Sequence, residues 1–380
     1  MSERLLGDLA ELTVGHVGSM ASEYVEEGIP FLRSLNVQPF RLDLSGVKYI
    51  SPEFHAKLQK SELSPGDVVV VRTGVPGTAA VVPKDLPVAN CSDVVIVRPG
   101  PELDSRYLSY LINSAARGYI DSRVVGAVQQ HFNVGAARGI PIPAASLDEQ
   151  RRVAAVLGAL DDLIETNRQF AQQVRDLSST LYAKFAGSAR SNVPLGQVAS
   201  VSDRKIRPGK GSLRYIDIAA LGDGYLEFPQ PIDWDDAPSR ARVGVEDGST
   251  LWSTVRPNRR AHALVVDAPG DLVASTGIAV LTPRGIGPGE LFAACDRDEF
   301  VDQLVAMADG SAYPAVRPTA FRDIPIRHLG GLASEAFERV MWPLWRDVHA
   351  AVEEVSRLTR ARDELLPLLM SGKVRTREVA

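Results

Sequence analysis

The sequence predicts an α+β protein in which two tandem, similar domains are each followed by a long α-helix, and the two helices pair as an antiparallel coiled coil. Three observations predict this architecture. The chain repeats itself once, its domains contain short strand-like runs separated by Gly and Pro, and two long segments carry heptad spacing. A length of 380 residues, 45% of them hydrophobic, is sufficient for two such domains to bury separate cores.

The internal repeat extends over whole domains. Five runs of the first half return in the same order in the second: LLGDLAEL at 5 as PLGQVASV at 194, FLRSLNV at 31 as YIDIAAL at 215, GDVVVVRTG at 66 as GSTLWSTVRP at 248, DVVIVRP at 93 as GIAVLTP at 277, and GIPIP at 139 as DIPIR at 323. Residues 68–72 and 94–97 predict strands, and residues 105–116 predict a helix. The repeat divides the chain into a domain at 1–145, a helix at 146–190, a second domain at 191–330 and a second helix at 331–380.

Each domain is followed by a segment with the signals of a long helix. Ser146 can cap the first helix, and Glu149 stands three residues further on. Positions spaced alternately by four and three form a seam on each helix. The seam includes Val153, Leu157, Leu160, Ile164, Asn167, Val174 and Leu181 on the first helix, and Met341, Leu344, Val348, Val355, Leu358 and Leu365 on the second. Either seam could pack on its own domain. Because the segment occurs twice, we expect the two seams to pack against each other, with Asn167 and Arg362 setting the register.

Composition excludes several classes of protein. A formal net charge of -5 excludes a protein that binds nucleic acid alone through a broad basic surface, since that requires many Lys and Arg residues opposite phosphates. The apolar runs are far shorter than a membrane-spanning helix, and the first residues lack the order of a signal peptide. With only Cys91 and Cys295, no disulfide framework is expected, and we expect a cytoplasmic protein.

The sequence carries none of the common catalytic motifs. It lacks a phosphate-binding GxxxxGK[ST] loop, an HExxH helix and a GxSxG elbow. The His and Cys residues do not have the spacing of a known zinc site. The Asn/Asp-Pro-Pro-aromatic loop with which DNA amino-methyltransferases hold a flipped base is also missing. We therefore expect a non-catalytic chain without a bound metal or cofactor.

Polar clusters follow the predicted strands and are the candidate binding residues. In the first domain they are Arg33, Ser34, Asn36, Arg72, Thr73, Gln129, Gln130, His131 and Asn133. In the second domain they are Arg204, Lys205, Arg207, Lys210, Arg256, Asn258, Arg259 and Arg260. Arg, Asn and Gln can form paired hydrogen bonds with a base edge, and Ser and Thr can hold phosphates. Each cluster could instead be a solvated loop, but Arg72 and Arg256 both follow equivalent strands, which favours binding.

Four runs resemble the specificity subunit of type I restriction-modification systems: GIPFLRSLNV, KSELSPGDVVVVRTGVPG, QQHFNVGAARGIPIPAASLDEQRRVAAVLGALDDLIETN and ELLPLLMSGKVR. The resemblance covers essentially the whole chain. The second copy departs from the pattern, because Arg327 replaces the second Pro and Glu338 stands where the first copy has Gln150.

The resemblance implies a DNA-binding subunit with two target-recognition domains, each of which reads one half of a bipartite, asymmetric site while the coiled coil sets the unread spacer. It implies three kinds of partner: double-stranded DNA, two copies of a DNA methyltransferase subunit that bring S-adenosylmethionine, and a translocase-nuclease restriction subunit. If the partner subunits share in binding the DNA, the negative net charge of this chain is explained. The alternative is a structural or regulatory scaffold that only assembles methyltransferase subunits and reads no bases.

Overall fold

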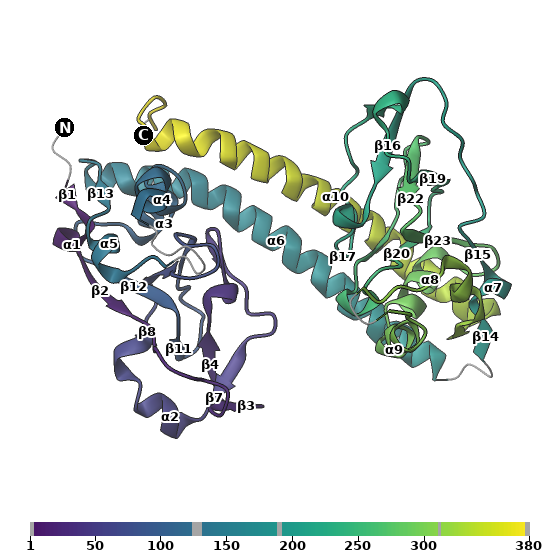
Figure 1. Ribbon diagram of the computed structural model, residues 1–380, viewed down its shortest axis with the longest axis horizontal. Coiled ribbons are helices and arrows are strands. Elements are labelled where there is room, and N and C mark those ends of the chain that lie inside the picture. The colour runs from purple at the N-terminus through teal and green to yellow at the C-terminus, as the bar shows by residue number, and fades with distance from the viewer. Residues whose placement is uncertain (1–3, 124–130, 188–191, 311–312, 377–380) are drawn as a thin grey trace. The chain divides into compact units, whose positions relative to one another are not determined.

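A computed structural model describes residues 4–123, 131–187, 192–310 and 313–376. The chain forms two compact units, Met1–Asp162 with Leu358–Ala380, and Leu163–Arg357. Each unit contains one mixed domain and a part of two long helices, α6 (Leu147–Ala186) and α10 (Gly331–Met370), shown in Figure 1. The predicted α+β class is confirmed. Among the described residues, no helix is long and apolar enough to cross a membrane.

The first domain is built on two sheets. The order β10-β9-β12-β2 makes one sheet and β3-β7-β4-β11-β8 the other. The run VVVV of β9 is buried on both faces, because Val68 and Val70 pack beneath helix α3 while Val69 and Val71 pack toward the second sheet. The strands and helices are β2 (Ala10–Val14), β3 (Tyr24–Val25), β4 (Ile29–Leu32), β7 (Lys48–Ile50), β8 (Glu62–Leu63), β9 (Val68–Val71), β10 (Ala79–Val81), β11 (Ala89–Cys91), β12 (Val94–Pro99), α2 (Pro52–Ala56), α3 (Ser105–Asn113) and α4 (Arg117–Arg123).

Small elements complete the first domain. They are the pair β1 (Arg4–Leu5) and β13 (Pro141–Ile142), the pair β5 (Val37–Gln38) and β6 (Arg41–Leu42), and α1 (Leu6–Leu9), η1 (Ser34–Asn36), η2 (Gln59–Ser61) and α5 (Val134–Arg138). Helix α3 begins after its cap Asp104, whose side chain accepts a hydrogen bond from the Tyr107 backbone N–H, and it ends three residues before the predicted end.

The second domain repeats this plan. Its sheets are β15-β23-β20-β21-β17 and β18-β16-β22-β19, with helices α8 and α9 on the outer face of the first sheet. The strands are β14 (Asn192–Pro194), β15 (Ala199–Val201), β16 (Ser212–Ile216), β17 (Asp223–Gly224), β18 (Ile232–Asp233), β19 (Ala241–Gly244), β20 (Thr250–Ser253), β21 (His262–Leu264), β22 (Leu272–Ser275), β23 (Ile278–Pro283) and β24 (Pro325–Arg327). The helices are α7 (Leu195–Val198), η3 (Ile218–Ala220), η4 (Trp234–Asp236), η5 (Pro257–Arg259), α8 (Pro288–Cys295), α9 (Asp298–Ala306) and η6 (Pro318–Asp323).

The strand registers make the two copies comparable residue by residue. Val71 lies opposite Val94 in the first domain, and Ser253 lies opposite Ile278 in the second. Strands β9 and β12 therefore correspond to β20 and β23, as the repeat predicts. The turns η1 and η3 also follow equivalent strands, β4 and β16.

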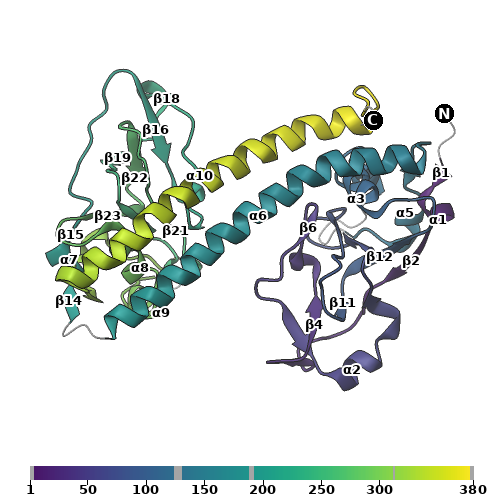
Figure 2. The same cartoon turned by 180° about the vertical axis from the view of Figure 1, so that it is seen from behind.

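The helices α6 and α10 run side by side in both views (Figures 1 and 2). The Glu149 backbone N–H donates to Ser146 Oγ over 3.2 Å, which confirms the predicted cap. All thirteen predicted seam residues are buried or partly buried, whereas Leu163 is 50% exposed on another face of α6. Pro343 and Pro367 are both accommodated within α10.

Cross-helix contacts within each unit show that the pairing is antiparallel. In the first unit, Arg362 in the C-terminal part of α10 donates to Asp161 in the first half of α6 over 2.8 Å. In the second unit, Asn167 donates to Glu354 over 2.9 Å. Both predicted polar seam residues therefore pair with an acid on the opposite helix. The seams also contribute to the domain cores, since Leu157 packs in the first core and Met341 in the second.

Candidate nucleic-acid interface

Three predicted clusters of the first domain meet where β9 ends. The Asp93 carbonyl accepts hydrogen bonds from the Arg72 backbone N–H over 3.2 Å and from Ser34 Oγ over 2.9 Å. The Arg72 carbonyl accepts from the Phe132 N–H over 3.0 Å, and Thr73 Oγ1 lies 3.0 Å from His131 Nδ1 in a second hydrogen bond. We call this group, Ser34, Arg72, Thr73 and His131 around the Asp93 backbone, the first strand-end site.

The cations of this region lack acidic partners. The Nε atoms of Arg72 and Arg33 are buried without a hydrogen-bond acceptor, and neither guanidinium pairs with a carboxylate among the described residues. Arg33 donates instead to the Gly46 carbonyl over 3.1 Å and lies 6.0 Å from the centroid of the Tyr24 ring. A buried N–H without a partner costs about 1–3 kcal/mol. The site therefore favours a ligand that supplies negative charge or hydrogen-bond acceptors.

Other predicted residues of this domain serve the loop itself. Asn36 is fully buried: its Oδ1 accepts from the Arg33 N–H over 3.0 Å and its Nδ2 donates to the Asp43 carbonyl over 2.9 Å. The structure thus places Asn36 inside the domain, where it fixes η1 and cannot reach a base. Asn133 is exposed and caps α5 by accepting from the Ala136 N–H over 2.8 Å. The predicted residues Gln129 and Gln130 lie outside the described residues.

The second domain has the same strand-end frame with different side chains. The Gly277 carbonyl accepts from the Thr254 N–H over 2.9 Å, and the Thr254 carbonyl accepts from the Val316 N–H over 2.8 Å. These bonds make Thr254 the counterpart of Arg72, and Arg256 lies two residues further along. The expected equivalence of Arg72 and Arg256 is therefore replaced by one between Arg72 and Thr254.

Arg256 opens a short loop in the second domain. Its backbone N–H donates to the Pro314 carbonyl over 2.7 Å, and its guanidinium lies 4.6 Å from the centroid of the Tyr313 ring. Asn258 and Arg259 follow on η5 and are exposed. We call Arg256, Asn258, Arg259 and Tyr313 the second strand-end site. No local pattern pointed to Tyr313, because this residue is distant from β20 along the chain.

Arg260 belongs to a partly buried ionic cluster rather than to this site. It pairs with Asp298 and with Asp296, which also accepts from Arg175 of α6 over 2.6 Å and from His262 Nε2 over 2.9 Å. Burial opposes ionisation of Asp296, but hydrogen bonds from Arg175 and His262 outweigh it, so the pKa of this carboxyl lies well below its usual range. The charge of Arg260 is neutralised within the protein, so Arg260 has a structural role there.

The predicted basic loop extends a sheet edge. The Gly244 N–H donates to the Arg204 carbonyl over 2.8 Å, and Lys205 forms a bridge with Val243 of the edge strand β19. The side chains of Arg204, Lys205, Arg207 and Lys210 are exposed, and no ion pair involves them within the described part of the chain. This loop supplies free positive charge on the second domain.

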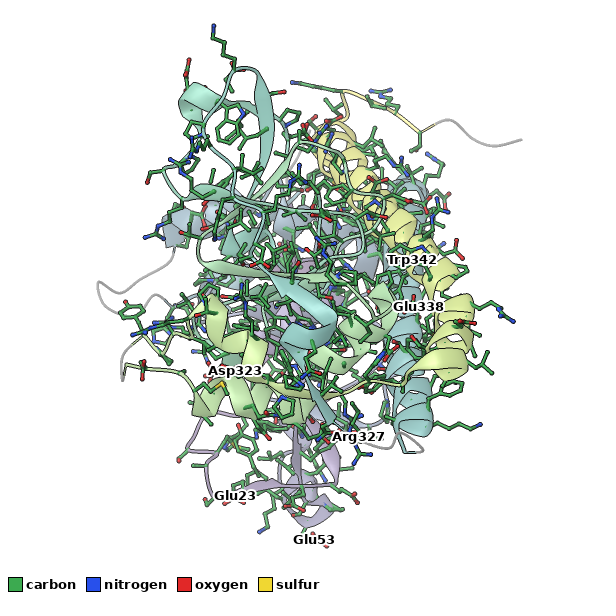
Figure 3. The ribbon with its side chains drawn as sticks, turned by 90° about the vertical axis from the view of Figure 1, so that its right-hand side faces the viewer. Glu23, Glu53, Asp323, Arg327, Glu338 and Trp342 are labelled. Atoms are coloured by element: carbon green, nitrogen blue, oxygen red, sulfur yellow. The ribbon has the colours of Figure 1, made fainter. Side chains whose placement is uncertain are left out.

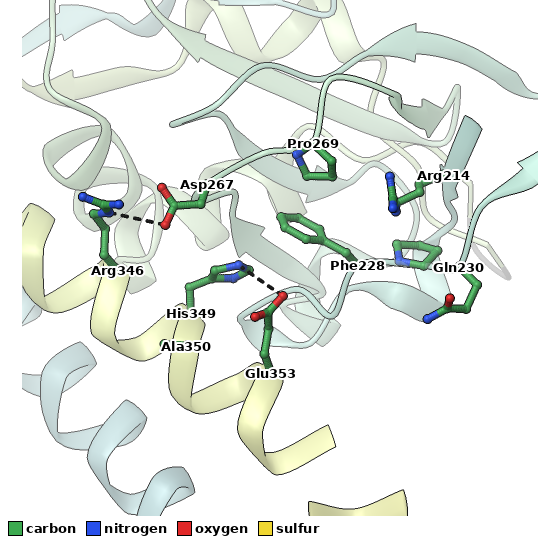
Figure 4. A pocket seen from close by; sticks show the side chains of 10 residues that line it. Arg214, Phe228, Gln230, Asp267, Pro269, Arg346, His349, Ala350 and Glu353 are labelled. Carbon is green, nitrogen blue, oxygen red and sulfur yellow. Dashed lines mark hydrogen bonds and ion pairs between the residues drawn. The ribbon is translucent and has the colours of Figure 1, made fainter. Parts of the chain in front are cut away.

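A hollow of about 510 Å³ lies between the second domain and α10 (Figure 4). Its charged groups are largely compensated: Arg346 lies 3.3 Å from Asp267, and Arg214 lies 2.6 Å from Asp271. His349 lies 3.7 Å from Glu353, and its ring centroid is 4.9 Å from that of Phe228. The residues that line the hollow thus form polar contacts within the second unit, between its domain and α10.

Gln150 and Glu338 perform the same task in the two copies. In the first, Gln150 Oε1 accepts from the Asp104 N–H, the cap of α3, over 2.9 Å. In the second, Glu338 Oε1 accepts from the Glu290 N–H in the first turn of α8 over 2.6 Å. Figure 3 shows Glu338 on α10, one turn before Trp342. Burial raises the pKa of Glu338, and the nearby charge of Glu290 adds to that effect.

Comparisons with known proteins identify the fold. No protein-family model matches the chain, and no curated protein matches it. The chain is similar to the solved S subunit of the type I restriction-modification system from M. genitalium, with 16% sequence identity over 97% of this chain and 95% of that chain and a TM-score of 0.57. The HsdS subunit from Thermoanaerobacter tengcongensis aligns over 98% of this chain and 97% of that chain at 17% identity, with a TM-score of 0.36. The first likeness shows that this chain has the fold of a type I S subunit.

Proposed function

We propose that this chain is the sequence-specific DNA-recognition subunit of a type I methyltransferase and restriction complex. Each domain reads one half of a bipartite, asymmetric target, and the helix pair sets the spacer. The observation that carries the proposal is the repeated strand-end frame, which bears Arg72, Thr73 and His131 in one copy and Arg256, Asn258 and Arg259 in the other. A shared frame with different side chains is what two unequal half-sites require. The fold of the M. genitalium S subunit supports the proposal.

The charge of the chain supports shared DNA binding. With a formal net charge of -5, the subunit neutralises few phosphates, so partner proteins must supply most of that attraction. The expected partners are two methyltransferase subunits, which carry S-adenosylmethionine and the catalytic residues, and a translocase-nuclease subunit. The chain itself contributes the recognition of bases. A good bidentate contact discriminates between the correct base and a wrong one by about 1–3 kcal/mol of binding free energy.

The test is half-site discrimination by the assembled complex. The target is first mapped from methylated adenines, and binding is then measured to the target and to single-base variants of each half. Arg72→Ala is expected to weaken binding and, if it contacts a base, to reduce discrimination in one half only, and Arg259→Ala in the other half only. Arg4→Ala is the matched control, because Arg4 is an exposed arginine paired with Glu102 over 2.8 Å. It should leave binding unchanged.

Each outcome separates the competing functions. An equal loss of binding affinity for all DNA sequences would identify the substituted residue as a phosphate contact. In that case the slope of log affinity against log salt concentration should also become smaller by about one unit. Unchanged binding by both variants would favour the alternative, a scaffold that assembles methyltransferase subunits without reading bases.

A further inference from the structure

We propose that Tyr313 is a positioning residue that holds Arg256 for bidentate recognition of a guanine in the half-site read by the second domain. This inference rests on the proposed function and names one contact within it. The guanidinium of Arg256 lies 4.6 Å from the Tyr313 ring centroid, and the residue Tyr313 is 70% exposed. The pair is therefore on the surface.

The position of the Arg256 guanidinium over the Tyr313 ring determines which of its groups can bind DNA. A guanidinium on an aromatic face keeps its plane fixed, while its N–H groups remain available at the edge of that plane. Arg256 has no carboxylate partner among the described residues, unlike Arg260 four positions later, which pairs with Asp296 and Asp298. A planar fork with free N–H groups matches the adjacent O6 and N7 acceptors of guanine in the major groove.

The backbone holds both members of the pair in place. The Arg256 N–H donates to the Pro314 carbonyl over 2.7 Å, directly after Tyr313, and Val255 forms a bridge with Ala315. Arg256 and Arg260 have φ values of 51° and 53°, a left-handed conformation that costs a residue with a Cβ about 1–2 kcal/mol. Such strain persists where surrounding structure imposes it, and it is common at ligand-binding sites. The loop is thus fastened at Arg256 by Pro314 and at Arg260 by Asp296.

The described part of the first copy has no such pair at this position. There the bridge position of Val255 and Ala315 is occupied by Thr73 and His131, joined by a hydrogen bond over 3.0 Å, and the counterpart of Arg256 is Gly74. The same frame therefore presents an arginine over an aromatic ring in the second domain and a hydroxyl with an imidazole in the first. We expect the two half-sites to differ at the base pair that Arg256 contacts.

The experiment measures binding of the assembled complex to its mapped target and to all single-base variants. Arg256→Ala and Tyr313→Ala should both reduce discrimination, by about 5- to 150-fold, at the same G·C pair of one half-site. Arg256→Lys keeps the charge but not the fork, so it should lose that discrimination while retaining most of the affinity. Tyr313→Phe keeps the ring and should behave as wild type. The double variant Arg256→Ala/Tyr313→Ala should lose no more discrimination than Arg256→Ala alone.

Three results would overturn the inference. The first is full discrimination by Tyr313→Ala, the second is an effect of the two alanine variants at different base pairs, and the third is an equal loss on every DNA sequence. The midpoint of thermal unfolding of the complex distinguishes a loss of folding from a loss of base recognition. Tyr313→Ala should leave this midpoint unchanged, because Tyr313 is largely exposed. A wild-type complex without any sequence preference would refute the proposed function itself, whereas a specific complex with unaffected variants would refute only the role of Arg256 and Tyr313.

Discussion

Asp296 joins three parts of the second unit through one carboxylate. It accepts hydrogen bonds from Arg175 of α6 and from His262 of β21, and it pairs with Arg260, the residue that follows η5. The His262 ring is stacked between Trp252 and Phe292, with centroid distances of 4.4 and 5.5 Å. Its Nδ1 faces the Arg260 carbonyl over 2.6 Å. Both ring nitrogens of His262 therefore lie within hydrogen-bond distance of oxygen atoms, so the ring is held in one orientation between the two aromatic side chains.

Asp296→Asn should therefore destabilise the chain by about 3–5 kcal/mol, because it leaves buried cations without their counter-charge. The pKa of Asp296 is lowered on folding from its ordinary value of 3.8, so its contribution is present above that pH and is lost as the pH falls further. The difference between wild type and variant in urea unfolding should accordingly be large at pH 7 and smaller at pH 3. Asp298→Asn is the control: the Asp298 side chain is 84% exposed, and the change should cost less than about 0.5 kcal/mol.

Glu338 gives the opposite dependence on pH. Because burial raises its pKa above the ordinary 4.5, its contribution is fully present below that pH and is lost as the pH rises through the higher folded-state value. Glu338→Gln introduces the residue type of Gln150, which in the first copy accepts a hydrogen bond from a backbone N–H at the start of α3. The variant should gain stability relative to wild type as the pH increases from 4 to 8, measured as the difference in unfolding midpoints. A difference that is independent of pH would contradict this account.

Residue types alone could not assign roles to the predicted candidates. Arg72, Arg256 and Arg260 look equivalent in the sequence, yet Arg260 is neutralised by Asp296, which is distant along the chain. The equivalence of Arg72 with Thr254 depends on the register of β9 with β12 and of β20 with β23, which no local pattern reveals. A local signal was sufficient for the strand-end position of the first domain, because Arg72 directly follows the buried apolar run of β9.

At the scale of elements, heptad spacing predicted α6 and α10, and a cap predicted the start of α6, because these signals lie within a few turns of one helix. Two-residue strands such as β3 and β8 were beyond prediction, since each exists only through hydrogen bonds to a partner strand. The polar seam contacts are more elaborate than expected. Arg362 bonds to Asp161 and also lies 4.5 Å from the centroid of the Phe40 ring, so it ties both helices to the first domain.

Leu160→Asp tests the seam. A carboxylate placed in a partly buried apolar position should cost about 1–3 kcal/mol of stability. Leu163→Asp is the control, because Leu163 lies three residues further on and is 50% exposed. Chemical unfolding of the two variants should differ by that amount. Equal stability would mean that the seam of α6 is not packed as described.

At the scale of the molecule, both long helices continue from one compact unit into the other. If the pair sets the spacer, one heptad inserted after Asp162 and one after Arg357 adds about 10.5 Å to each helix while keeping the seam on the same face. The unread spacer should then grow by about three base pairs with both half-sites unchanged, as read from the methylated sites of the altered complex. Altered half-sites, or a spacer of unchanged length, would refute the idea that the helix pair sets the spacer.

The first core also draws on both extremities of the sequence. Leu6 and Leu9 share it with Leu366, Leu369 and Met370 of α10, whereas the second unit is one continuous stretch of chain. On a ribosome, the whole of residues 163–357 is therefore made before the first core can close. At ~5–20 residues per second this takes ~10–40 s, during which the nascent first domain keeps an open apolar face. The domain that is synthesised first is thus the last to be completed.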